Sequence, residues 1–229
     1  MKKLTVLALA GLLVFSSIVL IGCGSPEQTL ISRYIQAIRM GDKDTIVKIS
    51  LVPVKVDLVK WKIVSKTQPV EEKTIIGDLA KKMEEAKKNM EKLQEDAALA
   101  KVDFDEFDAK YQKWSRARKR ANKKKYEDLK KKYEDLKAQF LQAKEEYEKI
   151  TEQYNNEKKL MALSVGDIPE IEKLEGKVYS EEIVIEGTTK EGKTEKFKFH
   201  LVRYELTKPG VSTPIRGRWV VKNIERLTE

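Results

Sequence analysis

The chain of 229 residues is poor in the residue types that build crosslinked or metal sites, with one cysteine and one histidine. A single cysteine excludes a disulfide framework within the chain, and one cysteine with one histidine excludes an ordinary Cys/His zinc site. Glycine and proline are also scarce, at 11 and 6 residues, whereas 36% of the residues are charged and the formal net charge is +9. This composition favours long helices over a compact enzyme.

The single cysteine follows a stretch typical of exported proteins. A basic start, MKK, precedes the apolar run LTVLALAGLLVFSSIVLIG, and this order predicts a signal peptide. The residues at its end, Leu20–Cys23 (LIGC), resemble the lipobox of bacterial lipoproteins. The resemblance implies a signal peptide over residues 1–22, transfer of a diacylglyceryl group to the Cys23 sulfur, and cleavage before Cys23.

An uncleaved transmembrane anchor is the alternative interpretation, because the apolar run is nearly long enough to span a bilayer. Both interpretations place residues 24–229 on the extracytoplasmic side, at a bacterial cell membrane or outer membrane. A mature lipoprotein carries more than one acyl chain, which gives stable anchoring, whereas a single chain binds marginally. We therefore expect a lipid-anchored protein of the cell envelope.

The middle of the chain predicts long helices. From Asp78 to Val165 there is no glycine or proline, and good helix formers dominate. Apolar residues recur at alternating steps of four and three, which is the a/d spacing of a coiled coil. The first seam is Leu79, Met83, Ala86, Met90, Leu93, Ala97, Ala100, Phe104, Phe107, Tyr111 and Trp114. The second seam is Tyr126, Leu129, Tyr133, Leu136, Phe140, Ala143, Tyr147, Ile150, Tyr154, Glu157 and Met161.

The two seams are out of phase by one residue, which would turn the apolar stripe by about 100° on a continuous helix. A turn between the seams explains this better than one straight rod. Folding the chain back about Arg120 places an a position against a d position at every layer, beginning with Trp114 against Tyr126. We predict an antiparallel coiled-coil hairpin over residues 76–164, with its tip near 117–123.

Two alternatives to this hairpin stay open at the level of sequence. The stretch DFDE, which begins at Asp103, is compatible with a capping box and hence with a helix that starts there. The first seam nevertheless continues through Asp103 without interruption. The two seams could also pair between two chains rather than within one, and the periodicity is the same in both arrangements.

Positive charge concentrates around the predicted tip. Between Lys110 and Lys132 there are twelve Lys and Arg residues against two acidic residues, a local net charge of +10. The candidate contacts to an anionic partner are Arg116, Arg118, Lys119, Arg120, Lys123, Lys124 and Lys125. Outside the cytoplasm such a partner would be lipid headgroups, lipopolysaccharide, teichoic acid or an acidic protein, and the export pattern argues against nucleic acid. The alternative is a solvated helix end with no ligand.

Residues 23–75 and 165–229 predict the two halves of a small α+β domain. The stretch SPEQ at residues 25–28 combines an N-cap serine, a proline at the first helical position and a capping-box glutamine, and Gly41 ends that helix. A short second helix follows, with Asp42 or Asp44 as its N-cap. Residues 54–66 (VKVDLVKWKIVSK) predict a strand. After the hairpin, the runs YSEEIVIEG, EKFKFHLVRYEL and RGRWVVKNIE alternate apolar with polar residues and predict antiparallel strands.

Two helices joined at AIRMGDKD, followed by a bent sheet that ends in GRWVVKNI, resemble the nuclear-transport-factor-2-like (cystatin-like) superfamily. More narrowly, the chain is similar to small bacterial lipoproteins that carry such a domain. The residues that carry the resemblance are Tyr34, Ala37, Gly41, Asp42, Trp219 and Val220. The resemblance covers about half of the chain and implies a cone-shaped pocket, which the inserted coiled coil puts in doubt. Periplasmic adaptor proteins of efflux pumps are similar in shape only.

No pattern in the chain points to catalysis or to a cofactor. His200 lies alone in a predicted strand, and no Ser-centred elbow, phosphate-binding glycine loop or metal-ligand spacing occurs. The sequence therefore predicts a non-enzymatic, membrane-anchored adaptor, spacer or tether that acts through a basic-tipped coiled coil. The alternative is a ligand-binding lipoprotein with a pocket in the α+β domain, in which the coiled coil serves oligomerisation.

Overall fold

The computed structural model describes residues 24–208, 210 and 213–227. The predicted signal peptide (residues 1–22) and Cys23 lie outside the described residues. The described chain divides into two compact units. One unit contains the residues up to Lys73 together with those from Leu160 onward, and the other is Thr74–Lys159.

The first unit begins with two short helices whose ends are set by capping residues. Helix α2 spans Pro26–Met40, and the Ser25 hydroxyl accepts a hydrogen bond from the backbone N–H of Gln28. The helix ends at Gly41, whose φ of 68° lies in the left-handed region that glycine adopts at no steric cost. Helix α3 spans Lys43–Ile49, and the Asp42 carboxylate caps its N-terminus by accepting from Thr45 N–H. The caps predicted at Ser25 and Gly41 are confirmed, and of the two candidates Asp42 and Asp44 it is Asp42 that caps α3.

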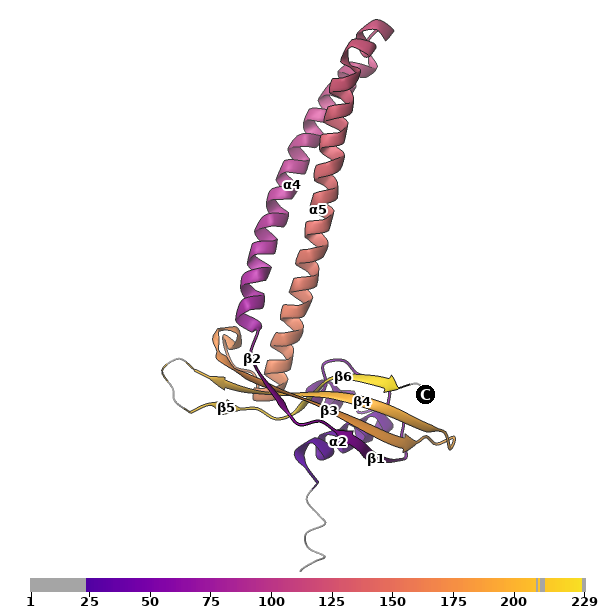
Figure 1. Cartoon of the computed structure of the whole chain (residues 1–229), viewed down its shortest axis with the longest axis vertical. Coiled ribbons are helices and arrows are strands. Elements are labelled where there is room, and N and C mark those ends of the chain that lie inside the picture. Colours follow the sequence, from indigo (N-terminus) through magenta and orange to yellow (C-terminus); the bar gives the residue numbers. More distant parts are fainter. Residues whose placement is uncertain (1–23, 209, 211–212, 228–229) are drawn as a thin grey trace, which may run out of the picture. The chain divides into compact units, whose positions relative to one another are not determined.

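The sheet of this unit has six antiparallel strands built around one long hairpin (Figure 1). Strands β3 and β4 pair from end to end, and both β1 and β2 pair with the free edge of β3. Strands β5 and β6 pair with the free edge of β4. The strands are β1 Lys60–Lys66, β2 Val70–Lys73, β3 Glu175–Thr188, β4 Thr194–Thr207, β5 Ile215–Arg216 and β6 Val220–Leu227. A short 3-10 helix, Ile171–Lys173, precedes β3.

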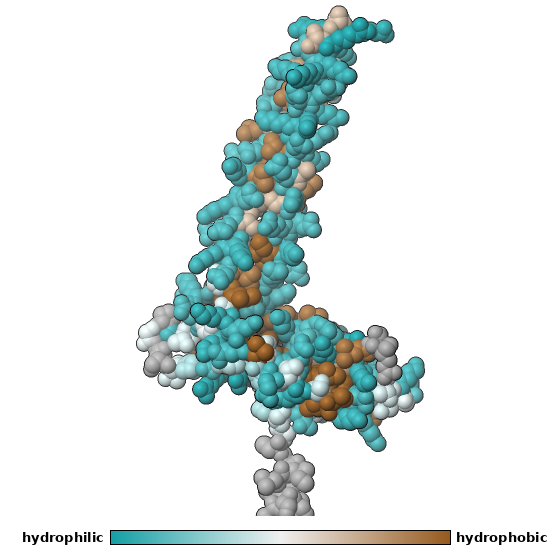
Figure 2. Space-filling view, in the orientation of Figure 1, coloured by the Kyte–Doolittle hydropathy of each residue, from teal (hydrophilic) through white to brown (hydrophobic). Residues whose placement is uncertain are grey.

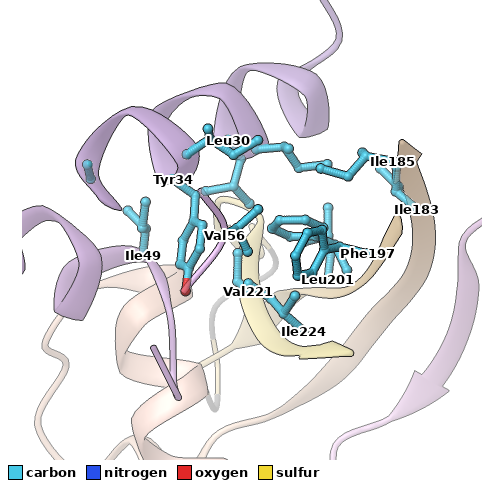
Figure 3. Close-up of a cluster of buried hydrophobic side chains, with 14 of the residues drawn as sticks. Leu30, Tyr34, Ile49, Val56, Ile183, Ile185, Phe197, Leu201, Val221 and Ile224 are labelled. Carbon is cyan, nitrogen blue, oxygen red and sulfur yellow. The ribbon is translucent and has the colours of Figure 1, made fainter. Parts of the chain in front are cut away.

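A hydrophobic core joins α2 and α3 to one face of this sheet. Figure 3 shows Leu30 and Tyr34 of α2 directed toward Phe197 and Leu201 of β4. Tyr34 is fully buried, and its ring meets that of Phe199 edge to face at 5.8 Å. Period-2 alternation places alternate residues of each strand on this face, which explains why one side of the sheet reads as apolar.

The last turn of α5, described below, is tied to the other side of the same sheet. The Ser164 hydroxyl donates to the carbonyl of Arg218 at 2.7 Å and accepts from the backbone N–H of Tyr204 at 3.0 Å. The backbone of Gly217 approaches Ser164 closely, because a Cβ at this position would lie 2.2 Å from the Ser164 hydroxyl oxygen. The absence of a side chain at Gly217 therefore permits this contact.

The second unit is a pair of antiparallel helices that lie side by side (Figure 1). Helix α4 spans Ile76–Gln112 and helix α5 spans Arg116–Val165, of which the part after Lys159 belongs to the first unit. Ala97, Ala100 and Ala143, which belong to the two predicted seams, are buried. Figure 2 shows mainly hydrophilic residues over the outer surface of both helices. The α+β class with an inserted helical hairpin is therefore confirmed.

Two details of the predicted hairpin differ from the structure. The turn consists of residues 113–115, so the predicted tip near 117–123 was placed too late in the chain. Near the turn the ring of Phe104 stacks on that of Tyr133, with 6.3 Å between ring centres, and the ring of Tyr111 stacks on that of Tyr126, with 4.4 Å. In each pair the α5 residue lies three positions earlier in the chain than the predicted partner. Three residues are nearly one helical turn, so the same stripes still face each other.

The alternatives to the hairpin are also decided. Helix α4 continues through Asp103 without a break, so the capping-box interpretation at DFDE was wrong. The ring contacts between Phe104 and Tyr133 join α4 and α5 of one chain, so the seams close within the molecule. The helical hairpin is consistent with the coiled-coil prediction.

The sheet also differs from the prediction in two places. Strand β1 begins at Lys60 rather than near residue 54, and Val54 instead bonds to the Tyr34 hydroxyl. Strand β2, Val70–Lys73, was not predicted, because all four of its residues are exposed and it carries no apolar alternation. It pairs with β3 through its backbone, and an ion pair between Glu71 and Lys177 of β3 at 2.6 Å adds to this pairing.

Candidate functional site

The predicted basic residues occupy the first turns of α5, directly after the turn of the hairpin. Arg116, the first residue of the helix, follows Ser115, whose carbonyl accepts from the backbone N–H of Lys119 at 2.9 Å. All seven candidate contact residues lie within the first ten positions of α5, and all but Lys119 are exposed. They therefore sit together on one short helical segment.

Aromatic residues at the end of α4 and in the turn contact part of this basic cluster. The guanidinium of Arg118 lies 4.4 Å from the ring centre of Trp114, and the Lys119 ammonium lies 5.6 Å from that of Tyr111. The Tyr111 hydroxyl donates to the Lys119 carbonyl at 3.3 Å. Cation–π contacts of this kind are worth about 0.5–1 kcal/mol at exposed sites. They fix the position of these cations but leave their outer sides open to solvent.

The charge at this helix end is opposite to what a helix prefers. The N-terminus of a helix carries a partial positive charge, which acidic residues stabilise and basic residues destabilise. The first turn of α5 contains no acidic residue, whereas it contains Arg116, Arg118 and Lys119. The arrangement therefore disfavours the helix and favours a bound anion.

A second candidate region lies in the first unit, where three charged side chains from α2, β1 and β3 meet. The Lys66 ammonium lies 2.9 Å from one carboxylate oxygen of Glu181 and 3.2 Å from one of Glu27. Burial alone would raise the pKa of Glu27, but hydrogen bonds from Ser25, its own backbone N–H and Lys66 outweigh burial and lower it. Burial would lower the pKa of Lys66, and its bonds to the two carboxylates raise it instead.

His200 lies on the opposite face of β4 from this cluster, between two carboxylates. Its Nδ1 is 3.2 Å from Glu182 of β3, and its Nε2 is 3.1 Å from Glu225 of β6. A neutral imidazole has one N–H and can donate to one of them, whereas the imidazolium can donate to both. The three residues border a depression of about 480 Å³ that also contains Thr67, Lys222 and Asn223.

Arg203 borders a separate pocket of about 400 Å³ at the start of α2. Its guanidinium lies 4.9 Å from the ring centre of Tyr179 and 5.2 Å from that of Trp219. Arg33 and Arg218 line the same pocket. Three arginines therefore surround one cavity, whose lining also contains the carboxylate of Glu27.

The structure places the predicted site residues unevenly. It brings the seven basic residues together at the hairpin end, and it surrounds His200 with carboxylates. The clusters around Lys66 and Arg203 were missed, because their partners come from segments far apart in the chain. One sequence feature could have pointed to the cluster around Lys66: Glu181 occupies a core-facing position of β3, beside Ile183 and Ile185, where an apolar residue is expected.

In residues 24–208, 210 and 213–227, no three His, Cys, Asp or Glu side chains gather closely enough to hold a metal ion. In the same residues, none of the helices combines the length and apolar character needed to cross a bilayer.

No family model matches the chain, and neither a curated protein nor a solved structure shows significant similarity to it.

Proposed function

We propose that this protein is an extracytoplasmic lipoprotein, anchored through Cys23, that acts as a non-enzymatic adaptor, spacer or tether. In this proposal the helical hairpin presents its basic end to an anionic component of the cell envelope or to an acidic protein. The lipobox-like residues Leu20–Cys23 support the anchor, and the apolar run before them supports export.

The observation that carries the tether is the charge distribution. Lys110–Lys132 holds a net charge of +10 in a chain whose total is +9, so the remaining residues are close to neutral together. Three of these cations, Arg116, Arg118 and Lys119, lie in the first turn of α5, where they oppose the helix dipole. A feature that lowers the stability of its own helix is expected to be retained for binding, since stability and function often conflict at binding sites.

Charge reversal at the hairpin end tests this function. In the native cell, a photoreactive residue at Ala117 should crosslink to a partner, and changing Arg116, Arg118, Lys119 and Arg120 to Glu should abolish the crosslink. The matched control reverses four exposed lysines elsewhere on the hairpin, Lys81, Lys82, Lys92 and Lys149, and should leave the crosslink intact. An unchanged set of partners in the first variant, with helix content preserved, would remove the basis of the tether.

A ligand-binding lipoprotein is the second candidate, and the pocket around Arg203 favours it. In this case the nuclear-transport-factor-2-like resemblance of the α+β domain would extend to a bound small molecule, and the hairpin would serve oligomerisation. The two candidates differ in a simple measurement. Reversal of the basic residues at the hairpin end would leave ligand binding in the pocket unchanged.

A further inference from the structure

The pocket at the start of α2 contains an arginine that is held in place but has no polar partner. Arg203 of β4 is in register with Tyr179 of β3, and its guanidinium lies between the rings of Tyr179 and Trp219. Stacking of this kind fixes the plane of a guanidinium without using its N–H groups. Within the part of the chain that the structure describes, the Arg203 guanidinium forms no hydrogen bond or ion pair; its contacts are those to the two rings.

The surroundings of Arg203 are cationic and partly apolar. The pocket of about 400 Å³ is lined by Arg33 of α2 and by Arg218, which is held by its bonds to the carbonyls of Leu163 and Lys48, both at 3.0 Å. Glu27 is the acidic residue of the lining, and the Lys66 ammonium at 3.2 Å compensates its charge. The apolar part of the wall consists of Leu30, Ile49 and Trp219. The cavity size falls in the range of about 300–1,000 Å³ typical of ligand sites.

We propose that this pocket binds a phosphate group, and that the source is the headgroup of an anionic phospholipid. A guanidinium offers parallel N–H donors that match phosphate oxygens, which is why arginine is favoured for this ligand. Arg203 supplies the oriented donors, Arg33 adds an exposed positive charge, and the apolar wall accommodates the glycerol end of the lipid.

The position of the pocket in the chain identifies the source. Pro26 lines the pocket and lies three residues after Cys23, and three residues span at most about 10 Å. An acylated Cys23 would therefore keep the pocket within reach of the membrane surface. The choice of a lipid over free phosphate rests on the proposed anchor, whereas recognition of the phosphate group does not.

The test uses the full chain in a non-ionic detergent, with the four basic residues at the hairpin end already changed to Glu to remove unspecific lipid binding. Native mass spectrometry measures retention of phosphatidylglycerol and phosphatidylcholine from an equal mixture. Preferential retention of phosphatidylglycerol is expected. The changes Arg203→Gln and Arg33→Gln should each weaken it about tenfold, or about 1.4 kcal/mol, because each removes one positive charge from the pocket.

Two comparisons make the outcome decisive. Arg39→Gln removes a charge from an exposed position of α2 outside the pocket and should have no effect, and Arg203→Lys should lose most of the binding although it keeps the charge. Equal retention of both lipids, or equal losses in Arg39→Gln and Arg203→Gln, overturns the proposal. Competition by inorganic phosphate with the same dependence on Arg203 would assign the site to the free anion. None of these results depends on the basic residues at the hairpin end. The proposed tether function is therefore tested independently, by the crosslinking experiment described above.

Discussion

At the scale of single residues, the Tyr34 hydroxyl joins α2 to the segment before β1. It donates to the Val54 carbonyl at 2.9 Å and accepts from the Val54 N–H at 2.7 Å, within a fully buried environment. Tyr34→Phe leaves both backbone groups without their partner, so we expect a loss of about 1–3 kcal/mol in the free energy of unfolding. Urea denaturation followed by far-ultraviolet circular dichroism measures this. A loss below about 0.5 kcal/mol, the range of ordinary surface substitutions, would contradict the role given to this hydroxyl.

Glu27 predicts how stability changes in acid. Its pKa is lower in the folded chain than its ordinary value, so the unfolded chain binds more protons as the pH falls. The stabilisation from this carboxylate is therefore present above the ordinary pKa of a glutamate, about 4.5, and is lost as the pH falls through and below that value. Glu27→Gln should flatten the pH dependence of the unfolding free energy between about pH 5 and pH 3. Glu175→Gln, at an exposed position of β3, is the control and should leave the slope unchanged.

These residue-scale features were only partly predictable from the sequence. Capping at Ser25 and Asp42 depends on neighbours three residues away, so the local pattern was sufficient. The bonds of Lys66 depend on Glu27 and Glu181, which lie 39 and 115 residues away, and no periodicity encodes such pairs. The stacking of Arg203 likewise depends on the register of β3 with β4.

At the scale of elements, the hairpin followed from periodicity because a coiled-coil seam repeats over many residues. The position of its turn did not, because the aromatic residues at the end of α4 also fit the seam. In the structure Phe107, Tyr111 and Trp114 form a cluster with ring centres 5.5–6.2 Å apart, and the turn begins directly within it. The symmetric fold about Arg120 counted Trp114 as a seam layer, whereas it belongs to the turn.

Small residues in the middle of the hairpin predict close helix packing. Ala100 of α4 is 2% exposed. Ala100→Trp should overpack this layer and destabilise the hairpin by about 1–3 kcal/mol, seen as a lower melting temperature of the helical signal. Ala98 is exposed two positions earlier on the same helix, so Ala98→Trp is a matched control with the same change in volume and should melt as the wild type does. Equal melting of both variants would show that Ala100 is not tightly packed.

At the scale of the whole molecule, the sequence determines the class of protein better than its activity. Hydrophobic periodicity and capping predict the α+β class, because they act through local geometry. Both proposed functions need a partner for the cationic surfaces at the hairpin end or around Arg203, and a fold alone does not identify a partner. Both proposals also rest on the proposed anchor at Cys23, which would set the compartment in which partners are sought.

Because Cys23 is the single cysteine of the chain, its proposed acylation has a clear test. Cells grown with an alkyne-tagged palmitate should label the wild-type protein. The mass of the mature protein should equal that of a chain that begins at Cys23 and carries its acyl groups. Cys23→Ala removes the sulfur that receives the diacylglyceryl group, so the label should disappear. Ser25→Ala, two residues further on, should remain labelled. Label that persists in Cys23→Ala, or a wild-type chain that retains Met1, would instead support the uncleaved transmembrane anchor, because that anchor needs neither the thiol nor cleavage.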